Sequence, residues 1–228
     1  MDDTTFNGLA ALVTGGARGI GAAVALRLAA GGADVALTYR AAEEEAAKVA
    51  AEIEGMGRRA LVVRADSGDP NAVVAAVDRA AGAFGRLDVL VNNAASYMVG
   101  PLDELDLDAF DAMVAVNVRG PYLASRAAAR HMGEGGRIIS IGSNVAVRAP
   151  FPGLTLYALT KSALVGMTKG LARDLGPHGI TVNLVHPGPT DTDANPADNP
   201  SAPTVAGLTA LNRYATAAEL SADGGWAA

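Results

Sequence analysis

Short apolar runs rich in β-branched residues alternate along the chain with longer, alanine-rich amphipathic segments. Continuous apolar runs are typical of parallel strands buried on both faces, and a 3.6-residue periodicity is typical of helices that pack on them. The pattern predicts strands at Ala10–Thr14, Asp34–Tyr39, Ala60–Arg64, Val89–Asn92, Arg137–Ile141 and Ile180–His186. It predicts helices at Ile20–Ala30, Ala42–Met56, Pro70–Phe84, Leu107–Asn117, Gly120–Met132 and Leu156–Leu175. This order predicts an α/β fold with a doubly wound parallel sheet and helices on both faces.

The length of the chain fits one domain with one sizeable core, so residues 1–228 are expected to form a single domain. The last forty residues are rich in Pro, Ala, Asn and Thr. A stretch of this kind beside regular elements predicts a mobile substrate lid at about 188–215 rather than a second domain.

Composition excludes several classes of function. The formal net charge is −6 and no run of Lys or Arg occurs, so neither nucleic acid nor an anionic membrane surface is an expected partner. The absence of cysteine excludes disulfides and thiolate ligands, and three dispersed histidines make a metal site unexpected. No apolar stretch is long enough to span a bilayer, and the polar start is unlike a signal peptide. We therefore expect a cytoplasmic protein.

A glycine-rich turn joins the first predicted strand to the first predicted helix. Within Thr14-Gly15-Gly16-Ala17-Arg18-Gly19-Ile20-Gly21, the glycines Gly15, Gly19 and Gly21 permit a tight turn and close helix packing. The helix N-terminus, at Ile20, offers unpaired N–H groups and a positive dipole end to an anion. Glycines also end strands for steric reasons alone. In the first βα turn of such a chain, however, they predict a Rossmann fold that binds a dinucleotide pyrophosphate.

The residues at the end of the second strand indicate which dinucleotide is bound. An acidic side chain there would bind the ribose 2′-hydroxyl of NAD and repel a 2′-phosphate. The chain reads Thr38-Tyr39-Arg40, with no acid. Arg40 and Arg18 can converge on a phosphate as charge-assisted donors, which favours NADP(H) and leaves NAD(H) possible. The alternative is that both arginines are solvated surface charges.

Tyr157 and Lys161 are four residues apart on a predicted helix and therefore on one face. An ammonium that stabilises the phenolate would ease proton exchange at neutral pH, so Tyr157 is the predicted acid for reduction. Ser143, after the fifth strand, is predicted to hydrogen-bond the substrate carbonyl. A Tyr and Lys at this spacing are often an ordinary surface pair, and a serine after a strand is often a cap.

Together with the glycine turn and the Tyr157–Lys161 pair, further motifs make the chain resemble the short-chain dehydrogenase/reductase family. The additional matches are Asp66, Asn92-Asn93-Ala94-Ala95, Asn117, Ser143 and Pro187-Gly188. The resemblance implies an NAD(P)-dependent oxidoreductase acting on alcohols and ketones.

The same resemblance implies roles for single residues. Asp66 would contact the adenine, and Asn93 and Ala94 would border the adenosine, although Asp66 could also be a helix-capping acid. Asn117 would hold a water for proton supply to Lys161, the alternative being an Asn at a helix terminus.

Further residues are expected to bind other parts of the cofactor, with Thr192 at the nicotinamide or the diphosphate. The cofactor would also contact residues from the Tyr and Lys motif, the second strand and the segment after the sixth strand: Tyr157, Lys161, Tyr39, Pro187, Gly188, Thr190 and Thr192.

Within the family the chain resembles bacterial members like 3-oxoacyl carrier-protein reductase, and more closely a subgroup of carbonyl reductases that includes a biofilm-dispersal protein. The motifs that carry this are Phe151-Pro152-Gly153, Ser162-Ala163-Leu164 and the run from Pro187 to Pro196. The substrate pocket is expected to be mainly apolar, with Tyr97, Val145, Phe151 and Pro189. It would accept a 3-oxo ester, an aryl ketone or a similar ketone.

The C-terminal region departs from the family pattern. Relatives place a helix and a last strand before an ending like Asp223-Gly224-Gly225-Trp226, whereas here only Ser221 and Ala222 follow the preceding segment. That helix and strand are expected to be shortened or missing. Family members commonly form homodimers or homotetramers, and the resemblance places this contact on helices 120–132 and 156–175.

A competing hypothesis is a protein that binds a dinucleotide or cyclic dinucleotide on the same scaffold with little turnover. The matched set Asn117, Ser143, Tyr157 and Lys161 favours the enzyme, because a sensor needs no paired acid and amine. A structural domain that binds no nucleotide would require the three glycines to serve packing alone.

Overall fold

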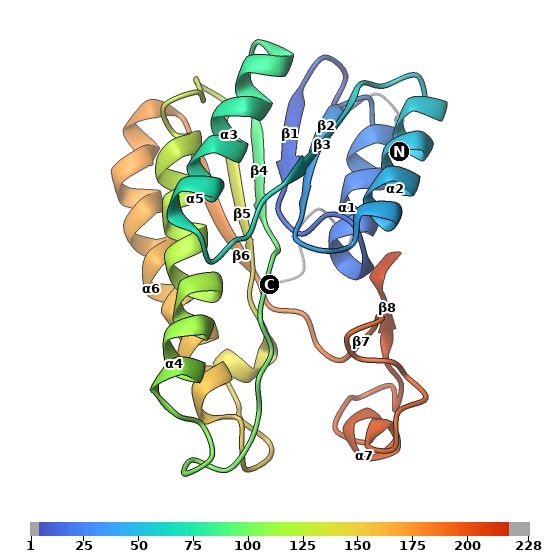
Figure 1. Ribbon diagram of the computed structural model, residues 1–228, viewed down its shortest axis with the longest axis vertical. Helices are drawn as coiled ribbons and strands as arrows, with labels where there is room; N and C mark the ends of the chain where they lie inside the picture. Colours follow the sequence, from blue (N-terminus) through green and yellow to red (C-terminus); the bar gives the residue numbers. More distant parts are fainter. Residues whose placement is uncertain (1–4, 219–228) are drawn as a thin grey trace.

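Six parallel strands form the central sheet of the protein, in the order β3-β2-β1-β4-β5-β6. The computed structural model describes residues 5–218 and is shown in Figure 1. The strands are β1 (Ala10–Val13), β2 (Asp34–Tyr39), β3 (Ala60–Arg64), β4 (Val89–Asn92), β5 (Arg137–Ile141) and β6 (Thr181–Val185). The predicted doubly wound Rossmann fold is confirmed, and the chain reverses direction across the sheet between β1 and β4. A crevice for a ligand forms at such a switch point, at the carboxyl ends of the strands.

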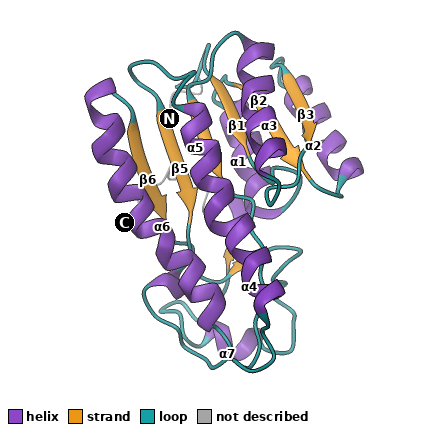
Figure 2. Ribbon diagram, turned by 60° about the vertical axis from the view of Figure 1, so that its left-hand side comes forward, coloured by secondary structure: helices purple, strands orange, loops and turns teal. Residues whose placement is uncertain are grey.

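Helices cover both faces of the sheet (Figures 1 and 2). They are α1 (Gly19–Ala30), α2 (Glu43–Gly55), α3 (Pro70–Phe84), α4 (Leu107–Val114), α5 (Gly120–Ala128) and α6 (Thr155–Leu175). In β1, Ala11 and Val13 pack with α1 and α2, whereas Leu12 packs with α3 and α5 on the other face. Alternate residues of a strand point to opposite faces, so a continuous apolar run serves two cores at once.

Local signals set the helix ends. The Asp69 carboxylate caps α3 by accepting hydrogen bonds from the main-chain N–H groups of Asn71 and Ala72, and Pro70 follows at the first helical position. Gly85, with φ of 75°, ends the same helix in the left-handed region. By contrast, α1 has neither a side-chain cap nor an acidic residue in its first turn. Its N–H groups therefore remain available to an anion.

The predicted break between helices at Asn117 is wrong. A π-helical segment, η1 (Ala115–Arg119), joins α4 to α5 without interruption, and Asn117 lies inside it. The alternative that Asn117 is a helix terminus is therefore also wrong. A π segment within a helix widens one turn and is frequent at functional sites.

Residues 188–215, which were predicted to form a lid and carry that name below, contain small elements of their own. The two-residue strands β7 (Thr190–Asp191) and β8 (Ala215–Thr216) pair in parallel, and α7 (Ala202–Ala206) lies between them. Figure 1 shows this segment beside the carboxyl ends of the main strands. It lies where it could cover a ligand bound in the crevice.

Three further expectations concern the C-terminal region, a membrane span and a metal site. The shortened region near 220–223 lies outside the described residues; within residues 5–218, β6 is the edge of the main sheet. Across the same residues, no helix combines the length and the apolar character that crossing a membrane requires. The described part also lacks a cluster of three or more His, Asp or Glu side chains that could hold a metal.

Candidate active site

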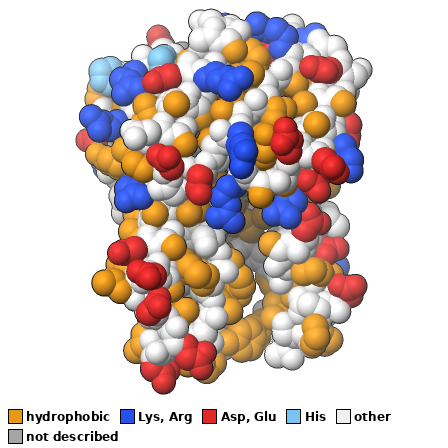
Figure 3. All heavy atoms as spheres, viewed as in Figure 1, with side chains coloured by type: hydrophobic (Ala, Val, Ile, Leu, Met, Phe, Trp, Pro, Cys, Tyr) orange, Lys and Arg blue, Asp and Glu red, His pale blue; other side chains and the backbone are white. Residues whose placement is uncertain are grey.

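A cavity of about 680 Å³ opens at the carboxyl ends of β1, β2 and β4. Figure 3 shows this face hollowed between the α4 side of the molecule and the segment that carries α7, with Lys and Arg side chains above the hollow. The lining residues come from the glycine turn, the turns after β2, β3 and β4, the π segment and the lid: Gly15, Ala17, Arg18, Gly19, Ile20, Thr38, Tyr39, Arg40, Ala41, Ala42, Ala65, Asp66, Ser67, Asn93, Ala94, Ala95, Ser96, Tyr97, Val116, Thr192, Asp193 and Ala194.

The glycine turn packs so closely that side chains would not fit. Gly15 has φ of 64°, and a Cβ on it would lie 3.0 Å from the Cα of Ala94. A Cβ on Gly21 would lie within contact distance of the Gly15 carbonyl oxygen and of the Asn93 side chain. Gly21 is therefore a packing residue and does not line the cavity, whereas Gly15 and Gly19 do. This closeness brings the uncapped start of α1 to the cavity wall.

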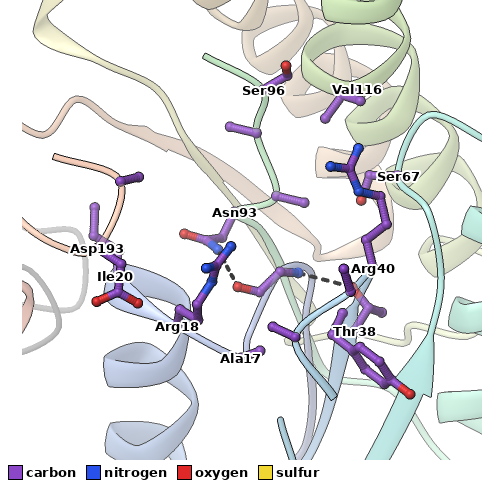
Figure 4. A pocket seen from close by; sticks show the side chains of 18 of the residues that line it. Ala17, Arg18, Ile20, Thr38, Arg40, Ser67, Asn93, Ser96, Val116 and Asp193 are labelled. Carbon is purple, nitrogen blue, oxygen red and sulfur yellow. Dashed lines mark hydrogen bonds between the residues drawn. The ribbon is translucent and has the colours of Figure 1, made fainter. Parts of the chain in front are cut away.

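Arg18 and Arg40 enter the cavity from two sides, one from the glycine turn and one from the turn after β2 (Figure 4). Among residues 5–218, neither guanidinium forms an ion pair with a carboxylate. Both side chains are exposed. Two unpaired cations beside an uncapped helix N-terminus suit a ligand with several phosphates, so the residues present fit a phosphorylated dinucleotide.

Asn93 and Thr14 fix the loop after β4 against the glycine turn. The Asn93 side chain donates to the carbonyl oxygens of Thr14 and Gly15 at 3.0 Å each, and the Thr14 hydroxyl accepts from the N–H groups of Asn93 and Ala94. Asp66 accepts from the Gly68 N–H at 2.8 Å and does not cap α3, because Asp69 does. Asp66 lines the cavity, as its predicted contact with the adenine requires.

Thr192 closes the cavity from the lid side. A Cβ on Gly19 would lie 3.2 Å from the Thr192 side chain, so the lid and the glycine turn are in close contact. Pro187, Gly188, Thr190 and Pro189, also predicted near the cofactor or substrate, do not line this cavity. Pro187 lies between β6 and the lid, and the other three residues form the first positions of the lid.

Tyr157 lies beside the cavity at the start of α6. Its ring meets the cavity-lining ring of Tyr97 edge to face, with centroids 4.8 Å apart. Burial raises the pKa of Tyr157, and a hydrogen bond with Ser143 lowers it by less. The net direction is opposite to the lowering expected from Lys161. The phenol is therefore protonated at neutral pH, the state that an acid requires.

Ser143 occupies the turn between β5 and α6 and lies next to Tyr157. Its hydroxyl accepts from the Val145 N–H at 3.2 Å and so caps the short helix η2 (Asn144–Ala146). The alternative of a capping serine is thus correct, and the same side chain also contacts the phenol. Ser140, by contrast, is buried within β5 and hydrogen-bonds Asn92.

Lys161 is buried one turn after Tyr157. Its ammonium donates to the Ile141 carbonyl oxygen at 2.9 Å and lies 5.7 Å from the centroid of the Tyr157 ring. Burial lowers the pKa of Lys161 to about 8. The amine can therefore gain or lose a proton near neutral pH, as a residue in a proton path must.

The lowered pKa of Lys161 predicts a pH-dependent stability. The unfolded chain holds this proton up to the ordinary pKa of 10.5, whereas the folded chain releases it near 8. Between pH 8 and pH 10.5 the free energy of unfolding of the wild type should therefore rise by about 1.4 kcal/mol per pH unit, compared with the free energy of unfolding of Lys161→Met. Denaturant titrations across this range measure the difference. The free energy of unfolding of Lys169→Met, which removes an exposed lysine of the same helix, should depend on pH as that of the wild type does. The same pH dependence for Lys161→Met and the wild type would contradict the burial of a charge at Lys161.

Asn117 connects the π segment to both sides of the site. Its side chain accepts from the Ser96 N–H at 2.7 Å and donates to the Ser96 carbonyl oxygen and the Thr160 hydroxyl. Thr160 in turn donates to the Tyr157 carbonyl oxygen at 2.9 Å. These bonds join the cavity wall at Ser96 to the helix that carries Tyr157 and Lys161. No sequence motif indicated that Ser96 or Thr160 belongs to the site. The only signal for Thr160 was its position next to Lys161.

The predicted substrate residues are only partly assembled. Tyr97 lines the cavity and touches Tyr157, whereas Val145 and Phe151 lie in the loop between Ser143 and α6 and outside the cavity lining. Asp193 and Ala194, at the mouth on the lid side, line the cavity, although the sequence did not single them out for the cofactor site.

Comparisons with known proteins agree with this architecture. A family model described as short chain dehydrogenase matches residues 9–202. The chain is 45% identical over 223 residues to the cyclic-di-GMP-binding biofilm dispersal mediator protein of Escherichia coli (strain K12), covering 98% of this chain and 90% of that protein. It is 42% identical over 192 residues to a versicolorin reductase of Emericella nidulans, covering 84% of this chain and 73% of that protein. The crystal structure of a short chain dehydrogenase from Burkholderia cenocepacia J2315 in complex with NADP is similar with a TM-score of 0.95 and 58% identity, covering 96% and 89% of the two chains.

Proposed function

Because the chain belongs to the short-chain dehydrogenase family of NAD(P)-dependent oxidoreductases, we propose that it is an NADPH-dependent ketone reductase in which Tyr157 donates the proton. The observation that carries this proposal is the contact between the rings of Tyr97 and Tyr157, because it places the protonated phenol beside the cavity. Arg18 and Arg40, which have no carboxylate partner within residues 5–218, line the same cavity. The NADP in the Burkholderia relative and the reductase name of the Emericella relative support the same choice.

The residues have distinct parts in the proposed reaction. NADPH, when bound, supplies the hydride for the carbonyl carbon. The phenol of Tyr157 donates its proton to the carbonyl oxygen, and the Ser143 hydroxyl holds that oxygen by a hydrogen bond. Lys161 returns a proton toward the phenol, with Asn117 keeping its π segment against α6. The lid at 188–215 covers the bound ligands and limits the access of water.

Different residues of the cavity would bind different parts of the cofactor. Arg18 and Arg40 would hold the 2′-phosphate, and the start of α1 would hold the pyrophosphate. Asp66, Asn93 and Ala94 would border the adenosine. Tyr39 lines the same part of the cavity, and Thr192, also in the lining, would contact the nicotinamide or the diphosphate.

The proposed substrate is a ketone with apolar substituents, such as a 3-oxo ester or an aryl ketone. Tyr97 offers an exposed aromatic ring next to the phenol, and Val145, Phe151 and Pro189 would complete an apolar wall once the lid closes. The test is the oxidation of NADPH in the presence of a panel of 3-oxo esters, aryl ketones and diketones. Turnover of at least one class supports the proposal, and binding of NADPH without turnover of any ketone would contradict it.

A second candidate is a protein that binds a cyclic dinucleotide, favoured by the 45% identity to a relative of that name. Arg18 and Arg40 would then contact the phosphates of the cyclic ligand. Competition distinguishes the two: cyclic di-GMP should displace NADPH in a fluorescence titration if it uses the same cavity. Tight binding of cyclic di-GMP together with absent ketone turnover would favour this candidate.

We also propose that the protein is a homodimer or homotetramer joined through α5 and α6. Figure 2 shows α4, α5 and α6 together on one face of the sheet. Large apolar side chains are exposed on all three helices, including Tyr122 on α5 and Leu159 on α6. Replacing both Tyr122 and Leu159 by Glu should convert the assembly to smaller species in light scattering, because charges would be buried at the contact. Met56→Glu, which places a glutamate on an exposed apolar position just after α2, should leave the assembly intact. A wild-type protein that is monomeric at micromolar concentration would contradict this arrangement.

A further inference from the structure

His186 follows β6, and Ser143 lies one residue beyond Gly142, which follows the neighbouring strand β5. The two turns run side by side, because main-chain hydrogen bonds join them on both sides of Ser143. These bonds are Gly142 N–H to Val185 O at 2.7 Å and Asn144 N–H to Pro187 O at 3.0 Å. The main-chain groups of Ser143 lie between them, and the Ser143 carbonyl oxygen also accepts from the Ala146 N–H at 3.0 Å within its own turn.

The Nδ1 atom of His186 contacts both of these groups. It lies 2.7 Å from the Ser143 carbonyl oxygen and 3.2 Å from the Ser143 nitrogen. A single ring nitrogen cannot donate and accept at once, so Nδ1 donates to the carbonyl in one tautomer and accepts from the N–H in the other. Either tautomer therefore ties Ser143 to the end of β6.

The residue before Ser143 makes room for the imidazole. A Cβ on Gly142 would lie 2.6 Å from Nδ1 and 3.0 Å from Cε1 of His186. The imidazole thus packs directly on the Gly142 main chain, and a side chain on residue 142 would collide with it. His186 is held by packing as well as by hydrogen bonds.

The position of the Ser143 hydroxyl depends on this main chain. The hydroxyl accepts from the Val145 N–H at 3.2 Å and contacts the Tyr157 phenol. A serine side chain has one rotatable bond before its oxygen, so a shift of the Ser143 main chain moves the oxygen with it. Displacements of about 1 Å at a reacting centre can lower a rate by about a hundredfold.

We propose that His186 is a positioning residue of the reduction, which acts by holding the Ser143 main chain so that the hydroxyl faces Tyr157 and the substrate carbonyl. The inference rests on the proposed function, because it needs Ser143 to contact the substrate. It gives a part in the reaction to a histidine that lies outside the Tyr157–Lys161 motif.

Two substitutions separate the hydrogen bond from the packing. His186→Leu removes the nitrogen, whereas His186→Asn places an amide atom where Nδ1 lies. We expect kcat for ketone reduction to fall about tenfold to a hundredfold in His186→Leu and to remain within about threefold of the wild type in His186→Asn. The dissociation constant of NADPH should change little in either. His178→Leu, which removes an exposed histidine after α6, is the control and should retain wild-type kcat.

A double-mutant cycle tests whether His186 acts through Ser143. In a Ser143→Ala background, His186→Leu should cause no further loss of kcat, since the hydroxyl is already gone. A further loss equal to that in the wild-type background would overturn the inference, as would equal kcat values for the Leu and Asn variants. If Ser143→Ala itself keeps full activity, the role of the serine in the proposed function fails, which is a different result. Circular dichroism and NADPH binding identify variants that do not fold.

Discussion

Tyr157→Phe is expected to lower kcat for ketone reduction by about a thousandfold, because the variant keeps the ring but has no proton to donate. Positioned general acids contribute about 10² to 10⁴ in rate. The ring should keep its contact with Tyr97, so the dissociation constant of NADPH should remain close to that of the wild type. Initial rates at saturating ketone and NADPH, together with a binding titration, measure both quantities.

Two further tyrosines serve as matched controls for this substitution. Tyr122→Phe removes a hydroxyl from α5, outside the cavity lining, and should have no effect on kcat. Tyr97→Phe removes a hydroxyl beside the cavity and should change KM more than kcat, because Tyr97 borders the substrate without donating the proton. A Tyr157→Phe enzyme that retains more than about a tenth of wild-type kcat would assign the proton to another donor.

The double substitution Arg18→Ala and Arg40→Ala is expected to lower kcat/KM for NADPH by about a hundredfold and that for NADH by less than about threefold. Both guanidiniums reach the cavity, and neither is paired with a carboxylate within the described residues. A hydrogen bond to a charged group contributes about 1.5 to 3 kcal/mol, and about 1.4 kcal/mol corresponds to a factor of ten. Each single substitution should therefore cost at least about tenfold with NADPH.

The comparison of the two cofactors locates the contact. Equal losses with NADPH and NADH would mean that the arginines bind the pyrophosphate, which both cofactors share, rather than the 2′-phosphate. Arg79→Ala removes an exposed guanidinium from α3 and controls for the change in net charge. The wild-type preference for NADPH should also weaken as salt concentration rises, since these side chains are exposed.

The main sheet and its helices could be predicted from the sequence because burial on both faces leaves continuous apolar runs, as in β1 and β2. The glycine turn was also predictable, because Gly15 and Gly21 lie where a side chain would collide with the loop after β4 or with the turn itself. Both signals are local in the sequence. They place the cavity and its wall without any knowledge of distant contacts.

Contacts between distant segments were not predictable in the same way. The π segment at Asn117 has no distinct residue pattern, so two helices were expected where one continuous run occurs. The rise in the pKa of Tyr157 depends on burial by neighbours, which outweighs the hydrogen bond from Ser143. The bonds from His186 to Ser143 span 43 positions and follow from the pairing of β5 with β6. Each of these features arises only when the sheet brings separate turns together.

The central claim, that the chain reduces a ketone with NADPH and with a proton from Tyr157, is tested most directly by isotope transfer. The wild type is incubated with a ketone from the panel that it turns over and with NADPH that carries deuterium at both positions of the reactive carbon, and the alcohol formed is analysed by mass spectrometry. The account predicts one deuterium at the carbinol carbon for the wild type and for Tyr122→Phe, and almost none for Tyr157→Phe. Absence of labelled alcohol with the wild type, or equal labelling with Tyr157→Phe, would contradict it.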